Sequence, residues 1–526
     1  MQADFDEMRF EIHDGSQWVD VSADVVGEHE GEIGGLGNDI SGRVGQAGEL
    51  RFSLRNSVNN QMGTPGWYSP GWEGAMPGFD VGAEVRLTYV YDTLDKQMWH
   101  GRIPDGGITV ESGMLGPRRT KVRCVDVMNE YAKSLELPTL ASSKTMDDVA
   151  DLVTVNLGIT LPNRQRGTMA KVFPMVFDTT RQVVAGVQEM AKAVLGEWGW
   201  AYVKQVRGAG TTLVTEGRYD RATAELQRIP LATPDCAVLE LTDGSLLELS
   251  DGSLLALSER EQARFDDNDI RSVETVRGAS LINQVRITLY PRYEDSDNDN
   301  VLWELEEPLL MDQLGGPYDT REIRVAYRAP GQEAQSIVTK DMKVPEWTAN
   351  TKKDGTGINV SAYVTVEAEY GAAEGKLVVR ATYHTDVWVR TIRCKGRGIY
   401  LFRAVDVLSR DEASQETYRM VKQLNLSQRY MADVVEGQEL ADHIISIEKD
   451  ARNNVVAVNF TANHSPRMMM AALFCESGSL VEVAEEQSRV SGWYFVQSKK
   501  WSTFGKGRFV RMRWSVIEAE RCGFAS

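Results

Sequence analysis

The stretch Glu49-Leu-Arg-Phe-Ser-Leu-Arg55 alternates between polar and apolar side chains with a period of two residues. Two further stretches, Glu84–Tyr91 and Thr120–Asp126, share this alternation. Such a period places one face of a β-strand on an apolar core and leaves the other face in water. Because loops rich in Pro and Gly, such as Gly63–Trp72, separate these stretches, the first 135 residues predict a small antiparallel barrel or sandwich.

Strand patterns of the same kind return near the other end of the chain. A helix predicted over Val434–Lys449 precedes them, and the strands follow at residues 455–460, 479–483, 492–497 and 509–514. Residues 305–390 are also rich in strand patterns with Gly-containing turns, which indicates an inserted β-sandwich.

The middle of the chain has a different pattern. Capping residues and helical spacing predict helices at residues 145–156 and 180–195, and a strand pair follows at 200–204 and 212–215. An eight-residue repeat occupies residues 243–258, and its two copies are too few for a solenoid, so it predicts a hairpin or a strand duplication.

The predicted fold is therefore mainly β with an α+β insertion, and it has two β-barrel domains, a small α+β domain and an inserted β-sandwich. The expected domains are an N-terminal β-barrel at 1–137, the small α+β domain at 138–235, strands that complete and link the barrels at 236–295, the inserted β-sandwich at 296–392, and a second β-barrel with a helix at 393–526.

The composition is that of a globular protein, with 42% hydrophobic and 25% charged residues among 526. The sequence has no run of about 18 apolar residues, so we expect no stable membrane insertion. Its acidic start lacks the basic and apolar regions of a secretion signal. The net charge of −18 makes the chain a poor nucleic-acid binder, although it could form a wall that DNA passes without sticking, or simply favour solubility.

Catalytic and cofactor motifs are lacking. The five cysteines lie at positions 124, 236, 394, 475 and 522, too far apart for zinc spacing, so we expect reduced and mostly buried thiols. The sequence contains no HExxH, GxSxG or GxxxxGK[ST] motif. With 76 acidic residues, no glycosidase pair can be singled out. We therefore expect no enzyme activity, no catalytic residue and no bound cofactor.

One acidic loop has the ligand spacing of a calcium site. Asp295, Asp297, Asp299 and Glu306 occupy positions 1, 3, 5 and 12 of such a loop. Asn300 replaces the glycine expected at position 6, and the flanks resemble strands instead of EF-hand helices. The alternative interpretation is a solvated acidic loop, so the metal prediction is none, with this loop as the single Ca²⁺ candidate.

The tryptophans suggest a second binding chemistry. Trp67, Trp72 and Trp99 look exposed from their surroundings and could stack on sugars. Tryptophans serve more often as core or interface anchors.

In the order of its motifs the chain resembles phage tail proteins of the baseplate hub type, the siphophage tail-tip hub or tail-associated family. The resemblance extends over about residues 40–520. It is carried by Gly42–Asn56 with Tyr68–Pro70 and Pro77–Gly82, Trp99–Ile103 with Val122–Asp126, Trp198–Tyr202 with Thr215–Tyr219, Leu281–Ile287 with Asp354–Gly357, and Leu440–Ile444 with Gly492–Val496.

This resemblance implies an assembly instead of a reaction. It implies two tail-tube-like barrels per chain, three chains in a ring that continues the tail tube, and a lumen for DNA ejection. Expected partners are copies of the chain, the distal tail, tape measure and tip or fibre proteins, in a virion tail assembled in the host cytoplasm. Strand edges near Arg51–Arg55 and Arg508–Arg513 would pair across subunits. The alternatives are a hexameric distal tail protein, another tail-tip ring component, or a carbohydrate-binding adhesin.

Overall fold

The computed structural model describes most of the chain outside its middle. The described residues are 6–36, 45–91, 94–113, 118–132, 163–166, 200–206, 210–216, 220–221, 223–230, 260–278, 281–312, 319–329, 332–333, 336–337, 341–371, 374–401, 403–428, 434–505 and 509–522. The predicted helices at 145–156 and 180–195 and the repeat at 243–258 lie outside these residues.

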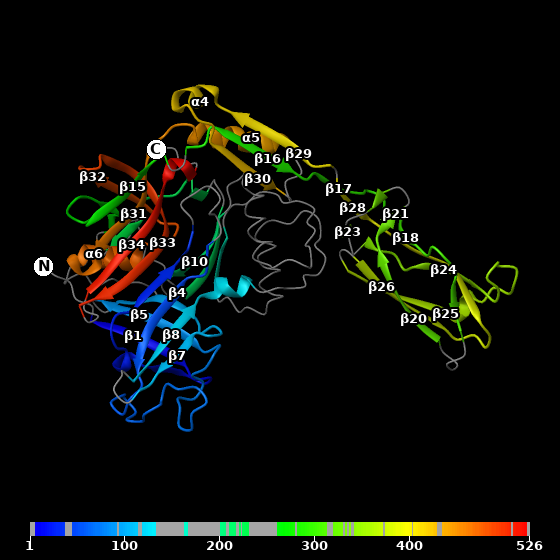
Figure 1. Ribbon diagram of the computed structural model, residues 1–526, viewed down its shortest axis with the longest axis horizontal. Helices are drawn as coiled ribbons and strands as arrows, with labels where there is room; N and C mark the ends of the chain where they lie inside the picture. Colours follow the sequence, from blue (N-terminus) through cyan, green and yellow to red (C-terminus); the bar gives the residue numbers. More distant parts are fainter. Residues whose placement is uncertain are drawn as a thin grey trace, which may run out of the picture.

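A 14-stranded sheet contains strands from both ends of the chain (Figure 1). Its strand order is β15-β31-β34-β33-β3-β4-β8-β6-β5-β1-β2, with β7 beside β8, β32 beside β33 and β14 beside β32. The N-terminal strands are β1 (Glu7–His13), β2 (Trp18–Asp20), β3 (Glu30–Ile33), β4 (Glu49–Arg55), β5 (Glu84–Tyr91), β6 (Leu94–Arg102), β7 (Ile108–Glu111) and β8 (Arg119–Val125). The later strands are β14 (Arg264–Phe265), β15 (Ser272–Arg277), β31 (Asn453–Thr461), β32 (Leu480–Glu485), β33 (Val490–Phe504) and β34 (Phe509–Glu518).

The short strand β3 joins the two ends. It pairs antiparallel with β33 on one side, where Glu30 lies opposite Ser502, and with β4 on the other, where Glu30 lies opposite Arg51. The mainly β prediction is confirmed, but the described strands form an open sheet instead of closed barrels.

The structure corrects the prediction that two strands have free edges. Strand β4 pairs with both β3 and β8, and β34 pairs with both β31 and β33. The prediction that residues 51–55 and 508–513 are free edges is therefore wrong for β4 and β34, because each is a central strand whose backbone is bonded on both sides.

One apolar core lies under this sheet and includes residues of both ends. Trp514 of β34 packs edge-on against Phe265 and Phe460. Helix α6 (Pro466–Phe474) covers the core, and its residues Met468–Leu473 are buried. The Ser465 side chain accepts a hydrogen bond from the Met468 backbone N–H and caps the helix start.

A second unit combines a sheet with helices. Strands β29 (Val405–Arg410), β16 (Gln284–Leu289) and β30 (Gln423–Gln428) form a sheet whose apolar residues pack on helix α5 (Val434–Glu448). This confirms the helix predicted from Val434. Helix α4 (Glu412–Tyr418) begins at Asp411, whose side chain accepts a hydrogen bond from the Ser414 N–H.

A third unit projects away from the large sheet (Figure 1). It has its own apolar core. Its strands are β17 (Arg292–Glu294), β18 (Asn300–Glu304), β19 (Leu309–Met311), β20 (Asp319–Ala326), β21 (Arg328–Ala329), β22 (Gln332–Glu333), β23 (Ser336–Ile337), β24 (Glu346–Asn350), β25 (Val364–Tyr370), β26 (Glu374–Ala381), β27 (Val387–Gly396) and β28 (Gly398–Leu401).

Smaller elements complete the described fold. They are the sheet β10 (Trp200–Val206), β11 (Gly210–Glu216) and β9 (Asn163–Arg166), the pair β12 (Arg228–Pro230) and β13 (Arg260–Gln262), and the 3-10 turns at Ser22–Asp24, Val127–Ala132, Ser361–Tyr363, Ala462–His464 and Ala519–Cys522. None of the helices in the described part of the chain has the length and apolar character that crossing a membrane requires.

The tight contact between β3 and β33 gives a first prediction. A Cβ atom added at Gly31 would overlap the Trp501 indole, whereas one added at Gly492 of β33 would have its nearest neighbour, in Tyr494, at an ordinary 3.5 Å. We expect Gly31→Ala to lower the free energy of unfolding by about 1–3 kcal/mol, the usual cost of overpacking. Gly492→Ala, the control, should change it much less. Denaturant unfolding measures both, and equal losses would contradict the tight fit at β3.

Candidate functional site at the junction of the two ends

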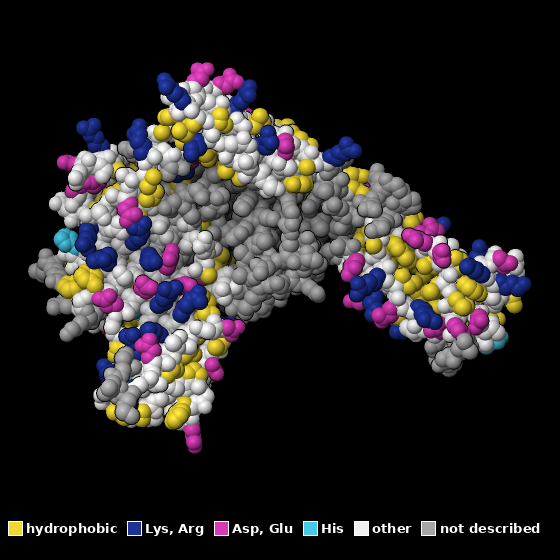
Figure 2. Space-filling view, viewed as in Figure 1, with side chains coloured by type: hydrophobic (Ala, Val, Ile, Leu, Met, Phe, Trp, Pro, Cys, Tyr) yellow, Lys and Arg dark blue, Asp and Glu magenta, His cyan; other side chains and the backbone are white. Residues whose placement is uncertain are grey.

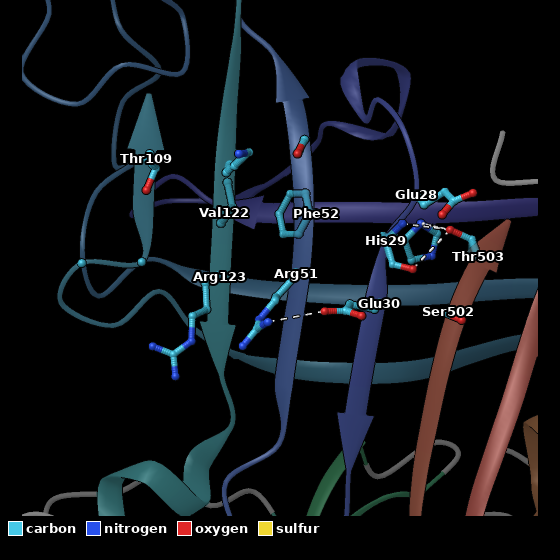
Figure 3. Close-up of a pocket in the computed structure, with 14 residues that line it drawn as sticks. Glu28, His29, Glu30, Arg51, Phe52, Thr109, Val122, Arg123, Ser502 and Thr503 are labelled. Atoms are coloured by element: carbon cyan, nitrogen blue, oxygen red, sulfur yellow. Dashed lines mark hydrogen bonds and ion pairs between the residues drawn. The ribbon is translucent and has the colours of Figure 1, made fainter. Parts of the chain in front are cut away.

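His29 lies where the two ends of the chain meet (Figure 3). Its backbone N–H donates to the Thr503 Oγ1 at 2.9 Å, and the Thr503 N–H donates to the His29 carbonyl at 2.9 Å. The imidazole Nε2 is 3.2 Å from the Tyr89 hydroxyl. Because the ring is buried, the pKa of His29 falls to about 4. His29 is therefore a neutral bridge between β5 and β33 at neutral pH.

Three buried charged side chains form a second contact between the ends. We name Lys96 of β6, Glu476 after α6, and Lys499 of β33 the junction triad. A Glu476 oxygen lies 2.9 Å from the Lys96 Nζ and 3.2 Å from the Lys499 Nζ. The three residues are 4%, 8% and 1% exposed. Two ammonium groups therefore share one carboxylate away from water.

Backbone carbonyls hold the two ammonium groups in place. The Lys96 Nζ donates to the Gln205 carbonyl of β10 at 2.6 Å, and the Lys499 Nζ donates to the Ala472 carbonyl of α6 at 2.9 Å. Burial lowers the pKa of Lys499, and the charge of Glu476 opposes that shift. The triad thus links β6, β10, β33 and α6 through charge-assisted contacts.

The space around the triad is closely packed. Glu476 makes ion pairs with the two lysines, but both of its oxygens, like the Ser477 Oγ and the Gln497 Nε2, are buried without a hydrogen-bond partner among the described residues. A Cβ atom at Gly34 or Gly478 would overlap Ser477 or the Tyr202 hydroxyl. The junction therefore joins parts of the protein and leaves little room there for a ligand.

An open hollow of about 410 Å³ lies on the polar side of the sheet beside this junction. Arg51, Lys121 and Arg123 line it, with Glu28 and Glu30 (Figure 3). The cations are compensated: Arg51 pairs with Glu49 at 2.6 Å, and Arg123 also pairs with Glu49. The hollow can accept a polar or charged side chain of another protein.

The polar face of the sheet continues across the junction. Residues Arg511, Ser502, Glu30, Arg51 and Arg123 lie opposite one another on five successive strands. Cross-strand partners point to the same face. Over the strands from β15 to β7, this face has eight cations and five carboxylates among the described residues: Arg51, Arg55, Arg119, Lys121, Arg123, Lys500, Arg511 and Arg513, with Glu30, Glu32, Glu49, Glu111 and Glu274.

Figure 2 shows basic and acidic side chains intermixed on the surface over the large sheet. Their balance, eight cations against five carboxylates, contrasts with the net charge of −18 for the whole chain. A uniformly acidic wall, which the composition suggests, is therefore not what this face presents.

The candidate calcium loop is arranged by its own hydrogen bonds. The Asp295 side chain accepts from the Asp297 N–H at 3.1 Å and from the Asn300 Nδ2 at 2.6 Å. Asp299 pairs with Lys343 at 2.8 Å, and Glu306 is exposed. Among the described residues, no group of three or more His, Cys, Asp or Glu side chains is placed to hold a metal ion. The calcium hypothesis therefore stays a prediction.

The three candidate tryptophans differ in their surroundings. Trp99 is fully buried, so its expected exposure is wrong, and Trp67 packs partly buried against the core. Trp72 is 63% exposed, as predicted.

The expectation of reduced, buried thiols is confirmed for three of the five cysteines. Cys124, Cys394 and Cys475 are free and buried. Cys236 and the Cys522 side chain lie outside the described residues.

Sequence reasoning missed the junction triad. Lys499 and Trp501 are both buried, so they occupy the inward positions of β33. The sequence offered one indication of the triad, because Lys499 occupies a position of the strand pattern where an apolar residue is expected.

Comparison with known proteins gives distant likenesses in fold. No family model and no curated protein matches the chain. Among solved structures, the prophage MuSo2 43 kDa tail protein from Shewanella oneidensis has 8% identity and a TM-score of 0.47, and the alignment covers 98% of this chain and 99% of that one. A tail protein from Neisseria meningitidis has 8% identity and a TM-score of 0.45, covering 97% and 96%. Prophage tail protein gp18 from Listeria monocytogenes has 7% identity and a TM-score of 0.37, covering 97% and 94%. Values this low do not establish a common family.

The junction triad predicts unequal effects of removing its members. Glu476→Gln leaves two buried ammonium groups without a counter-charge, so we expect a loss of about 3–5 kcal/mol in the free energy of unfolding. Lys499→Met leaves the Lys96–Glu476 pair and removes a desolvated charge, so its loss should be smaller. Denaturant unfolding compares the two variants, and an equal or larger loss for Lys499→Met would contradict this account.

The acidic loop gives a separate prediction. Because Lys343 already pairs with Asp299 and the Asp295 oxygens already accept hydrogen bonds within the loop, we expect millimolar Ca²⁺ to leave the melting temperature unchanged. Thermal shift of the wild type and of Asp297→Ala measures this. A calcium-dependent rise that disappears in Asp297→Ala would establish the site.

Proposed function

We propose that this chain is a structural component of a phage tail tip, a hub subunit without catalytic activity. Three copies would form a ring that continues the tail tube and encloses the channel for genome ejection. The observation that carries this proposal is the single sheet built from both ends of the chain, with strands left open at its two sides.

We assign two edges of the sheet, the terminal strand β15 and the branch strand β7, to pairing with another copy; β2, at the other end of the strand order, is a further edge. A run of eight strands leads from β15 through β31, β34, β33, β3, β4 and β8 to β7. Among the described strands, β15 pairs only with β31, and β7 pairs only with β8. Each edge displays a valine, Val276 at 43% and Val110 at 41% exposure. Unpaired edges favour addition of a further strand, and a head-to-tail contact between two different edges can close into a ring.

The dimensions of such a ring suit a channel. Three copies of an eight-strand run supply about 24 strands, and at a spacing of about 4.8 Å they span roughly 115 Å of circumference. The ring would be about 37 Å across when the strands stand upright and wider when they tilt. The apolar core and α6 lie on one side of the sheet, so the polar face would line the channel.

The balance of charges on that face suits passage of DNA. Its cations are largely paired with carboxylates, as Arg51 and Arg123 are with Glu49. Paired cations release few counterions from phosphate, so DNA would be held weakly. We infer distal tail, tape measure and tip or fibre proteins as neighbours in the virion tail, with assembly in the host cytoplasm.

One observation keeps the adhesin alternative open. The Tyr363 ring, 51% exposed, lies 5.0 Å from the Tyr383 ring on the projecting unit, and aromatic surfaces of this kind can stack on sugars. Glycan binding by the full chain that is lost in Tyr363→Ala would support this alternative.

The ring is tested by light scattering and electron microscopy of the purified chain. We expect a threefold ring, and we expect Val276→Lys to yield monomers because a lysine on an edge strand blocks edge pairing. Val344→Lys, at a 77% exposed position on the projecting unit, is the control and should leave the ring intact. Six copies per ring would favour the distal tail alternative. A wild-type chain that stays monomeric, with no ring in assembled particles, would overturn the proposal.

A further inference from the structure

The long connection between β4 and β5 is held in one conformation by its own side chains. We name residues 57–82 the Trp72 loop. Asn56, at its start, donates through Nδ2 to the Ser69 and Thr120 hydroxyls and accepts from the Tyr68 N–H. Asn60 accepts from the Met62 and Thr64 N–H groups through Oδ1. Both asparagines are 6% exposed. The loop therefore has internal bonds that fix it without regular secondary structure.

Buried side chains anchor this loop to the core of the large sheet. Tyr68, Met76 and Phe79 are buried in that core, and the Tyr68 ring packs edge-on against Phe79. The Tyr68 hydroxyl donates to the Asp24 Oδ2 at 2.7 Å, and the Gln61 N–H donates to the same carboxylate. The loop is thus bound on its inner side to both the apolar core and the turn before β3.

The Trp72 loop exposes four large apolar side chains among polar ones such as Gln61, Glu73 and Asp80. Trp72 is 63% exposed, Val58 56%, Met62 54% and Val81 48%. The Trp72 indole rests against Gly66, whose φ of +82° suits glycine and where a Cβ atom would be 3.2 Å from the ring. Four large apolar side chains are therefore displayed on a support that is already ordered, so binding would cost little conformational entropy.

The charges of the Trp72 loop indicate which class of partner it can bind. Between Asn56 and Ala83 the sequence has no Lys or Arg, and its charged residues are Glu73 and Asp80. Phosphate contact and attachment to an anionic membrane both need basic side chains, so nucleic acid and anionic lipid are disfavoured. Exposed Trp and Met are typical anchors of protein interfaces. The fitting partner is a protein surface with an apolar pocket and a basic rim.

The size and place of the patch argue for a repeated contact. The four side chains would bury much less surface than the roughly 800 Å² per partner that a stable interface buries. A ring repeats the patch around an axis, and linked weak contacts add up. The loop leaves the end of β4 and returns at the start of β5, so it lies beyond the strand ends, and it is on the side of the molecule opposite α4 (Figure 1).

We propose that the Trp72 loop docks, once per chain, into an apolar, basic-rimmed pocket of the protein ring that stacks on this end of the assembly. This inference rests on the proposed function, because stacking requires a ring. It adds which segment makes the contact and what the neighbouring protein must present.

The test uses particles from cells in which the natural copy is replaced by Trp72→Ala, Trp72→Phe or the control Val344→Ala. We expect at least tenfold less Trp72→Ala chain in purified tails, near-normal amounts of Trp72→Phe and Val344→Ala, and isolated Trp72→Ala that still forms the wild-type ring. A photo-crosslinking residue at position 72 should join the chain to one other tail protein in those particles, and the same residue at position 344 should not give that product.

The outcomes separate the two proposals. Wild-type chain missing from tails would overturn the proposed function itself. Wild-type chain in tails with Trp72→Ala incorporated equally would overturn the docking role alone. Crosslinking at position 72 to a second copy of this chain would show that the Trp72 loop contacts another copy and not a neighbouring ring. That result would overturn the inference.

Discussion

Strand β3 has only four residues, yet it is hydrogen-bonded on both sides to strands from opposite ends of the sequence. Its inner face has room for no side chain at Gly31, because the Trp501 indole of β33 fills that space. The N-terminal strands and the C-terminal strands therefore cannot slide relative to one another without breaking this fit, since a shift of one residue would reverse which side chains face the core. The common apolar core, the hollow and the continuous polar face all follow from that single register.

The buried charges next to this register restrict how the two ends of the chain can dock. A buried ion pair adds little stability compared with apolar side chains in the same place. An alternative arrangement that separates its members would leave a buried charge without a partner. Two lysines from different strands and one carboxylate after α6 meet at one point. An incorrect docking of the two ends would leave at least one of these charges unpaired. The neutral His29, buried between Tyr89 and Thr503, adds a directional requirement at the same junction.

Local patterns predicted the elements well and their connections poorly. The period of two at Glu49–Arg55 gave strand β4 with its bounds, and the helix expected from Val434 is present, because both depend on which side chains face a core nearby. The partners of β4 and β34 depend on segments hundreds of residues away, and no local pattern contains that information. Trp99 looked exposed for the same reason, since the core that covers it includes residues from the other end of the chain. The acidic loop at Asp295 has calcium spacing, but Lys343, from a distant segment, occupies one of its carboxylates.

The bond between His29 and Thr503 joins positions 474 residues apart. At a synthesis rate of about 5–20 residues per second, the N-terminal strands emerge roughly 25–95 s before the strand that completes them. During that interval β3 has one unpaired side, and the core under it is open. Native pairing of β3 with β33 must therefore follow translation of residues 499–502. A chain that is terminated before Val490 would lack β33, the strand that pairs with β3, so it could not enter an assembly built on this sheet.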